Sequence, residues 1–179
     1  GSQTILRAYE WSSGSWQQLG GDIASFDPDD YAGRMGSVGI NNEGTIVAIG
    51  ISGDDDNGNS SGKVQVFEYS SNSWSQKGQD LKGTNASDQF GQVLSLSGDG
   101  STLGIFSAVY ADNPITGRVL FYKFSQDLSN WEPRGSIVGT NDARFEFGGV
   151  SLSNDGTRAA IGNSVSINTN LRGYAQAFY

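Results

Sequence analysis

The sequence contains no cysteine and no histidine. The absence of cysteine excludes disulfides and thiolate nucleophiles, and the absence of histidine excludes a Ser–His–Asp triad. Zinc sites draw mainly on these two residue types, so nearly all zinc chemistry is excluded as well. The lack of disulfides does not identify the cellular compartment, because a well-packed repeat fold needs no covalent cross-link.

Positive charge is also scarce, since 11 Lys and Arg stand against 19 Asp and Glu and the net charge is −8. Such a surface repels phosphate backbones and anionic lipid, so we expect no nucleic-acid partner. No stretch approaches the roughly 18 consecutive apolar residues that span a bilayer, and we expect no membrane insertion. Helical periodicity is not visible, whereas 26 glycines punctuate short apolar runs, which favours an all-β fold.

What the sequence does contain is an internal repeat. Trp16, Trp74 and Trp131 lie 58 and 57 residues apart, each in a similar phrase that ends in glycine four positions later. A turn motif in which glycine follows an acidic residue recurs every 56 residues, at Gly44, Gly100 and Gly156. Self-similarity at a fixed period of this size indicates a repeat architecture.

Four strand types recur in a fixed order and are named A to D. Type A is expected at 36–40, 91–96 and 148–152, type B at 45–50, 101–106 and 157–162, and type C at 6–11, 63–69, 118–124 and 173–179. Each recurring tryptophan lies on a type D strand that follows type C. The acidic-Gly turn between A and B is a strong hairpin signal, because glycine accepts the positive φ that the turn demands.

Four antiparallel strands repeated at this spacing predict a β-propeller of four-stranded antiparallel blades. Types A and B carry small residues, which the innermost strands need where they converge on an axis, while C and D carry the aromatic residues. A β-sandwich is the alternative, since it also has short alternating strands. A sandwich has no reason to repeat one Trp phrase at an even interval.

We expect a single unit over residues 3–179, with partial repeats at 3–34 and 147–179 and intact repeats at 35–89 and 90–146. Gly1-Ser2 is interpreted as a tag remnant. About three blades do not close a ring, because natural propellers have roughly four to eight. We therefore expect a piece of a longer propeller or half of a homodimer with strand exchange at both seams. The last copy can take its missing D strand from residues 16–19, which leaves the strand at 6–11 surplus.

The pair Phe90-Gly91, the turn at 96–100 and the run at 117–122 resemble FG-GAP-type repeats, as found in integrin α-subunit heads. The likeness spans essentially the whole chain: Phe147-Gly148 repeats the pair, and Met35-Gly36 departs from it. The resemblance implies a propeller and an extracellular or cell-surface location, typical of cell-adhesion proteins. Family members often carry an Asp-x-Asp-x-Asp-Gly calcium cage between strands A and B. Here that junction is a tight turn with one acidic residue, so the cage does not carry over to Asp99 or Asp155.

The loop at 53–62 is the candidate metal site. Asp54, Asp56 and Asn59 offer carboxylate and amide oxygens in a glycine-rich segment, and Ca²⁺ takes six to eight such ligands. Calcium is the one cofactor that we consider. The alternative is a solvated connector, because Asp, Asn and Gly tolerate turns. Asp88 and Asp142, in the connections from D to A, are interpreted as turn caps.

No catalytic residue is identified, because the acidic residues cluster in loops and turns and none lies inside an A strand, whereas glycosidases hold paired carboxylates across a site. The main functional hypothesis is a non-catalytic extracellular or surface interaction module that binds a protein or glycan through its rim loops. One alternative is a carbohydrate-active or lectin-like propeller, and another is a structural self-assembly protein. The recurring tryptophans are interpreted as core residues, since a ligand site would more often break the repeat.

Overall fold

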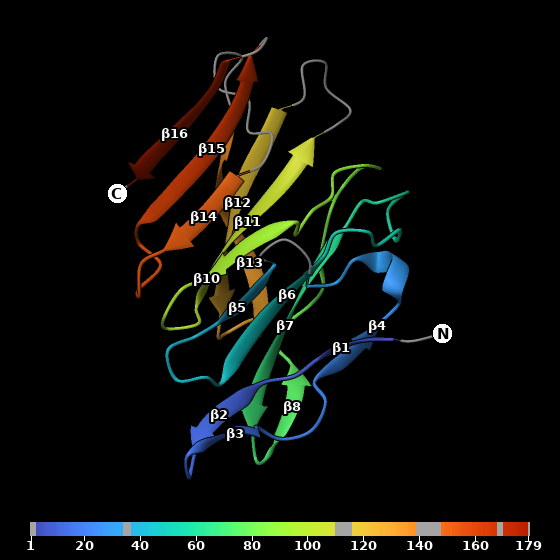
Figure 1. Cartoon of the computed structure of the whole chain (residues 1–179), viewed down its shortest axis with the longest axis vertical. Coiled ribbons are helices and arrows are strands. Elements are labelled where there is room, and N and C mark those ends of the chain that lie inside the picture. Colours follow the sequence, from blue (N-terminus) through green and yellow to red (C-terminus); the bar gives the residue numbers. More distant parts are fainter. Residues whose placement is uncertain (1–2, 34–36, 110–115, 139–147, 168–169, 179) are drawn as a thin grey trace.

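The computed structural model describes residues 3–33, 37–109, 116–138, 148–167 and 170–178 (Figure 1). These residues form strands β1 to β16 and one short 3-10 helix, Pro28–Asp30, so the chain is all-β. The strands make several antiparallel sheets, none of which closes on itself. Met35, Gly36, Asp142, Phe147 and Tyr179, which the sequence analysis used, lie outside the described residues.

Two sheets reproduce the predicted order A–B–C–D. The first consists of β5 (Val38–Ile40), β6 (Ile46–Ile51), β7 (Lys63–Ser70) and β8 (Ser73–Gln76), and β9 (Leu81–Lys82) also pairs with β7. The second consists of β10 (Val93–Leu96), β11 (Thr102–Val109), β12 (Thr116–Ser125) and β13 (Asn130–Val138). Every neighbouring pair is antiparallel, which confirms the predicted strand order for these two copies.

The chain ends carry parts of the same pattern. A third sheet, in the order A–B–C, consists of β14 (Gly148–Leu152), β15 (Ala159–Ile167) and β16 (Asn170–Phe178). At the other end, β2 (Tyr9–Ser12) pairs with β3 (Ser15–Gln18), and β1 (Thr4–Leu6) pairs with β4 (Ala24–Phe26). Trp16 lies on β3, so this end supplies a C–D pair.

The predicted single type C strand at 6–11 is wrong, because it divides into β1 and β2. The segment opposite, which connects β3 to β4, bulges at Gly20, where φ is 72°. The bulge lies between the hydrogen bonds from Leu19 N to Ala8 O and from Ile23 N to Leu6 O. The corresponding strand β7 is held on both edges, by β6 and by β8 and β9. In the described chain β1 and β2 each have a partner on one edge, so nothing bridges the bulge.

The turns between types A and B meet at one place. Gly44, Gly100 and Gly156 adopt φ of 71°, 71° and 64°, as the acidic-Gly motif predicted. Asn42 N donates to Gly98 O at 2.9 Å, and Asp99 N donates to Asn154 O at 2.8 Å. The side chains of Asn42 and Asn154 are joined by a 2.6 Å hydrogen bond. Three turns that lie one repeat period apart in sequence are therefore bonded to one another, and β10 lies beside both β5 and β14 (Figure 1).

The recurring tryptophans join consecutive copies. Trp74 Nε1 donates to Leu19 O at 2.8 Å, and Trp131 Nε1 donates to Lys77 O at 2.9 Å. Each acceptor lies three residues after the tryptophan of the preceding copy. The next residue is glycine, and a Cβ there would lie 2.9 Å from the Tyr69 ring at Gly20 and 2.7 Å from the Trp131 ring at Gly78. Only glycine leaves room for the aromatic ring above the acceptor carbonyl.

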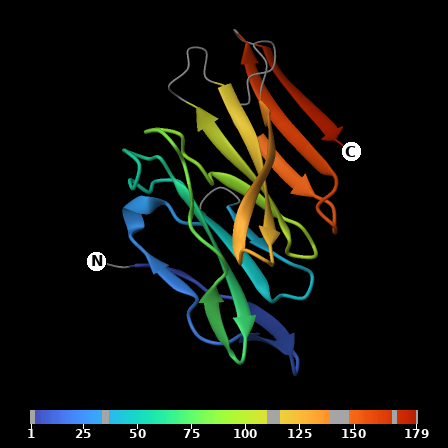
Figure 2. The same cartoon turned by 180° about the vertical axis from the view of Figure 1, so that it is seen from behind.

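The cores lie between sheets, which pack face to face in chain order (Figure 2). The largest core joins the sheet of β5–β9 to the sheet of β10–β13, with Ile46, Ala48, Val64, Val66 and Leu81 on one side and Phe90, Leu94, Leu96, Leu103, Ile105 and Trp131 on the other. A second core joins the N-terminal strands to β6 and β7, and a third joins β11 and β12 to β15. Each sheet thus has an apolar face toward each neighbour, which an isolated sheet would expose.

We predict that Trp131→Phe destabilises the protein more than Trp74→Phe does. Trp131 is 1% exposed, so the loss of its N–H leaves the Lys77 carbonyl without its donor beside a buried ring, at a cost of about 1–3 kcal/mol. Trp74 is half-buried, and water can reach the Leu19 carbonyl in its place. Urea unfolding of both variants measures the difference. Equal, small losses in the two variants would contradict the proposed role of the indole contact.

Candidate functional site

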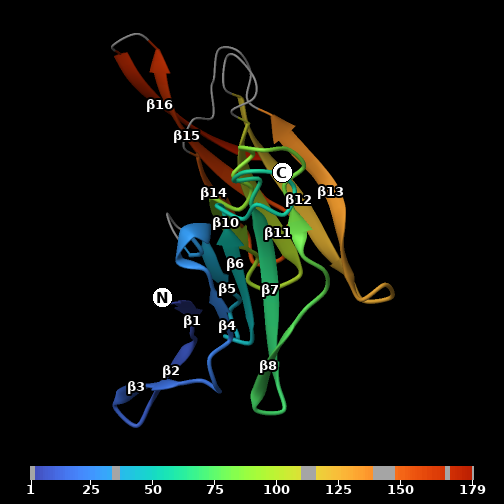
Figure 3. The ribbon, with the colours of Figure 1, turned by 90° about the vertical axis from the view of Figure 1, so that its right-hand side faces the viewer.

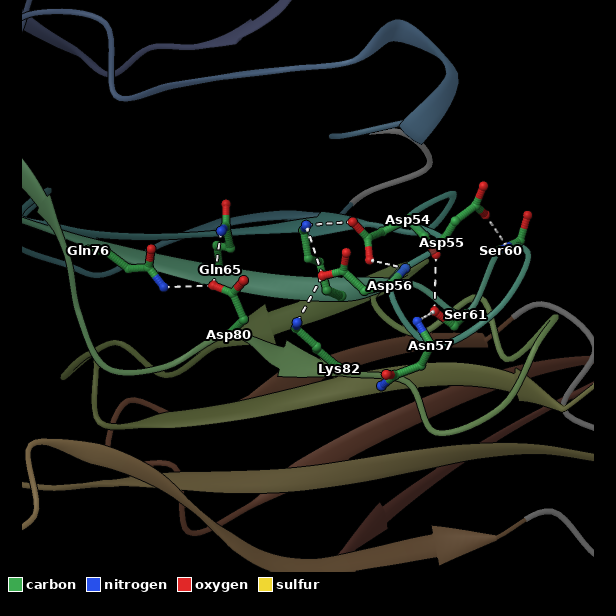
Figure 4. A network of polar contacts seen from close by, with 11 residues as sticks. Asp54, Asp55, Asp56, Asn57, Ser60, Ser61, Gln65, Gln76, Asp80 and Lys82 are labelled. Atoms are coloured by element: carbon green, nitrogen blue, oxygen red, sulfur yellow. Dashed lines mark hydrogen bonds and ion pairs between the residues drawn. The ribbon is translucent and has the colours of Figure 1, made fainter.

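An ion-pair cluster organises the loop between β6 and β7 (Figure 4). Lys63 Nζ lies 2.5 Å from Asp54 Oδ2 and 3.5 Å from Asp56 Oδ2. Lys82 Nζ lies 2.9 Å from the same Asp56 oxygen. Lys63 and Lys82 are directly opposite each other in β7 and β9, so strand register brings both ammonium groups beneath the loop.

The backbone of this loop is held by its own side chains. Asp54 Oδ1 accepts from Asp56 N at 3.1 Å, and Asp55 Oδ1 accepts from Ser60 N at 2.7 Å. The Ser61 hydroxyl donates to Asp54 O at 3.1 Å. The bond from Asp56 N to Asp54 is an Asx-type turn, in which a short polar side chain replaces a backbone partner, and the other two bonds join the two ends of the loop. The loop is therefore built as a fixed structure.

The neighbouring connection from β9 to β10 extends this structure. Ser87 N donates to Asn59 O at 2.8 Å, and Gln89 N donates to Ser60 O at 3.0 Å. Together, residues 53–62 and 83–89 form one continuous surface, which we call the rim surface. Its exposed members are polar or small: Asp55, Asp56, Asn57, Asn59, Thr84, Asn85 and Ala86.

Asp88 anchors the rim surface from below. Its side chain is buried, and Oδ2 accepts from Thr84 N and Asn85 N at 3.0 Å each and from the Thr84 hydroxyl at 3.1 Å. Arg118 Nη2 lies 3.4 Å from the same oxygen. The predicted turn-capping role of Asp88 is confirmed.

Electrostatics keep the cluster charged. Burial lowers the pKa of Lys63, but the hydrogen bond and the charge of Asp54 outweigh burial, and the pKa is raised. The hydrogen bond from Lys82, with the charge of Lys63, lowers the pKa of Asp56. Near neutral pH the two lysines therefore neutralise the two carboxylates that face them.

The structure brings two of the three predicted calcium ligands together. Asp54 and Asp56 converge on Lys63, whereas Asn59 is exposed, and its carbonyl accepts from Ser87. Within the described ranges, no three acidic, His or Cys side chains are grouped as metal ligands. Sequence reasoning missed Lys63, although it follows the acidic loop directly as the first residue of the expected type C strand. Calcium binding at Asp54, Asp56 and Asn59 stays a prediction.

The carboxylates of the turns between types A and B have a structural task. Asp155 Oδ1 accepts from the Ser153 hydroxyl at 2.7 Å, the Thr157 hydroxyl at 2.8 Å and Thr157 N at 3.1 Å. These three bonds lower the pKa of Asp155 to about 2. Asp99 makes the corresponding contacts in the preceding turn, where the hydrogen bonds outweigh burial and lower its pKa.

Comparisons with known proteins add no relative. No protein-family model matches the chain, and no curated protein matches it. None of the helices in the described ranges is long and apolar enough to cross a membrane.

We predict that Asp155→Asn flattens the acid end of the stability profile. A carboxylate whose pKa is lowered on folding stabilises the fold above its unfolded pKa of 3.8, and this contribution is lost as pH falls toward about 2. Thermal melts between pH 5 and pH 2 measure the slope, with Asp127→Asn in the exposed turn between β12 and β13 as the matched control. A profile for Asp155→Asn parallel to that of the wild type would show that the turn bonds contribute no pH-dependent stability.

We predict that Lys63→Met makes the loop responsive to calcium. Removal of the Lys63 ammonium leaves the Asp54 and Asp56 carboxylates without the cation that lies between them. The variant should therefore melt at a lower temperature than the wild type when EDTA removes metal ions. Millimolar calcium should then raise its melting temperature more than that of the wild type, because a ligand that binds only the folded state stabilises it. A shift of equal size in the wild type would instead support calcium binding at Asp54, Asp56 and Asn59 with Lys63 in place.

Proposed function

We propose that the chain is a segment of a β-propeller that acts as a non-catalytic interaction module at the cell surface or outside the cell. Its sheets are the blades, and the rim surface is the binding face for a protein or a glycan. Two observations together carry the proposal. The same indole contact joins successive sheets, and a polar surface fixed by hydrogen bonds lies at one end of the sheets.

Three features support the propeller arrangement. Each A–B–C–D sheet is built from one continuous segment, whereas a sandwich distributes successive strands between two sheets. The sheets pack face to face in chain order, and the sheets that carry Trp74 and Trp131 make the same indole contact to the preceding copy. The innermost strands β5, β10 and β14 lie side by side, and the turns that follow them are bonded together. These are the features of blades that converge on an axis.

Five acidic residues support a non-catalytic role, because each of the five has a structural partner. Asp54 and Asp56 bind lysines, Asp88 caps a connection, and Asp99 and Asp155 bind turn hydroxyls and amides. A general acid or base needs a proton that it can exchange with substrate near neutral pH. The lowered pKa values of Asp56, Asp99 and Asp155 keep these groups ionised and engaged.

The rim surface is favoured as the binding face because of where it lies. In an antiparallel A–B–C–D sheet, the B–C loop and the connection to the next sheet share one end, and the A–B and C–D turns share the other. The A–B turns are bonded to one another, whereas the rim surface turns its polar residues outward. Rigid scaffolds commonly present binding residues in this way.

We predict that partners of the isolated chain depend on the rim surface. The purified protein would be tested on a glycan array and against a phage-displayed peptide library. Each partner would then be retested with Asn59→Arg/Asn85→Arg, which places two bulky cations on the rim. The matched control is Gln126→Arg/Leu128→Arg, which adds the same charge at the turn between β12 and β13, at the opposite end of its sheet.

Loss of binding in the rim variant, with binding kept in the control, supports the proposal. A glycan partner would favour the lectin-like alternative within it, and a peptide partner would favour a protein ligand. Binding that both variants retain, or no binding in either screen, would count against a rim-directed interaction module.

A further inference from the structure

The first tryptophan of the series is exposed where its equivalents are covered. Trp16 is 65% exposed, whereas Trp131 is 1% exposed. Trp16 packs edge-on against Trp11 at 5.6 Å, as Trp131 does against Phe124, and Trp74 makes a tilted contact with Tyr69. Trp11 is itself 63% exposed. Hairpin β2–β3 therefore presents a pre-formed aromatic pair to solvent.

The last acceptor of the series is open where its equivalents are filled. Gly135 occupies the position of Gly20 and Gly78, four residues after the tryptophan of its own copy. No described atom lies within 4 Å of a Cβ built at Gly135, and its φ is 131°. The residue before it, Arg134, stands where Leu19 and Lys77 offer their carbonyls to an indole.

A cavity of about 160 Å³ lies beside this acceptor, between the sheet of β10–β13 and β14–β15. Its lining includes Thr102, Phe121, Arg134, Ile137, Leu152 and Ala159. One repeat earlier, the residues equivalent to five of these lie in the core that contains Trp131: Ile46, Val66, Leu81, Leu96 and Leu103. The cavity thus occupies the position of the core that Trp131 completes in the preceding pair of sheets.

The innermost strand β5 is also uncovered. Val38 and Ile40 are 46% and 52% exposed, whereas the equivalent residues of β10, Leu94 and Leu96, are 5% and 8% exposed. Among the residues whose burial is described, which leave out 163–178, seven of the nine exposed large hydrophobic residues fall within residues 5–40: Ile5, Tyr9, Trp11, Trp16, Tyr31, Val38 and Ile40. Such a concentration of exposed apolar side chains indicates an interaction surface.

We propose that a second copy of this chain covers both ends. Trp16 of one copy docks over Gly135 of the other and donates to the Arg134 carbonyl, so that β3 becomes the type D strand beside β16. The same seam brings β14 and β15 against β5, which covers Val38 and Ile40. A two-fold axis repeats the seam, and the resulting ring has about six blades, within the range of natural propellers.

We infer a second copy as the partner because one chain carries both the donor, Trp16, and the acceptor site at Gly135, but at positions too far apart to meet within one molecule. Hairpin β2–β3 and sheet β14–β16 lie at opposite ends of the molecule in both views (Figures 1 and 3). The contact itself is already made twice inside the chain, between Trp74 and Leu19 and between Trp131 and Lys77. The proposal rests on the propeller arrangement proposed above and is independent of what the rim surface binds.

Sedimentation of the whole chain over a concentration series tests the proposal. The wild type should form a two-chain species, and Trp16→Ala should weaken it at least about 30-fold, as truncation of a central interface tryptophan does. Leu128→Ala is the matched control, because Leu128 is also 65% exposed but lies in the turn between β12 and β13. A wild type that stays monomeric at roughly 100 μM overturns the proposal, since interfaces of standard size have dissociation constants of about 1 μM or lower.

Variants of the two halves distinguish this seam from other contacts. Gly135→Val places a side chain in the space that the indole would occupy. Val38→Lys changes an exposed residue of the same seam and does not replace a glycine. Each should weaken the dimer, with far-ultraviolet circular dichroism to verify folding. A mixture of Trp16→Ala and Gly135→Val retains one intact donor and acceptor and should recover part of the dimer. The proposed seam is wrong if Trp16→Ala and Val38→Lys leave the dimer dissociation constant unchanged, or if the mixture recovers no dimer. Neither result affects the test of the rim surface.

Discussion

The structure depends on one contact, in which an indole N–H reaches the carbonyl of the preceding copy above a glycine. The contact combines three requirements in a few atoms: a donor that must be satisfied when buried, a carbonyl at a bulge, and a residue without a side chain. Trp131 and Gly78 meet all three, with the indole 1% exposed in the largest core. Because the contact links neighbours and not strands of one sheet, each copy is stable through the next.

The same logic separates the two ends of each sheet. At one end the A–B turns are tied by backbone bonds through Asn42, Gly98 and Asn154, and their carboxylates are used to shape the turns. At the other end the loop at 53–62 is tied within its own copy, with Lys63 neutralising Asp54 beneath the surface. The two lysines therefore reduce the repulsion between carboxylates within this acidic loop.

Sequence periodicity was sufficient for the strand order and for the glycine turns, because both depend on local backbone chemistry repeated at a fixed interval. Gly44, Gly100 and Gly156 need positive φ for reasons that operate within four residues. The break between β1 and β2 was not predictable in this way. It depends on the bulge at Gly20 in the facing segment and on the lack of a second neighbouring strand, such as the one that β6 provides for β7. Lys63 was missed as the partner of Asp54 and Asp56. Its place beside Lys82 depends on the register between β7 and β9, which cannot be read from one continuous run of residues.

An array of repeats that functions as a monomer needs terminal copies with polar outer faces, because nearest-neighbour packing otherwise ends in exposed apolar surface. The first copy here has the opposite character: Trp11 and Trp16 keep the aromatic pairing of the interior copies while facing solvent. β5 likewise keeps the apolar pattern of β10, with Val38 and Ile40 in the places of Leu94 and Leu96. A surface that preserves interior chemistry position by position is better explained by a partner with the same repeat than by a cap, and both the indole and the glycine that this partner would need are present in one chain.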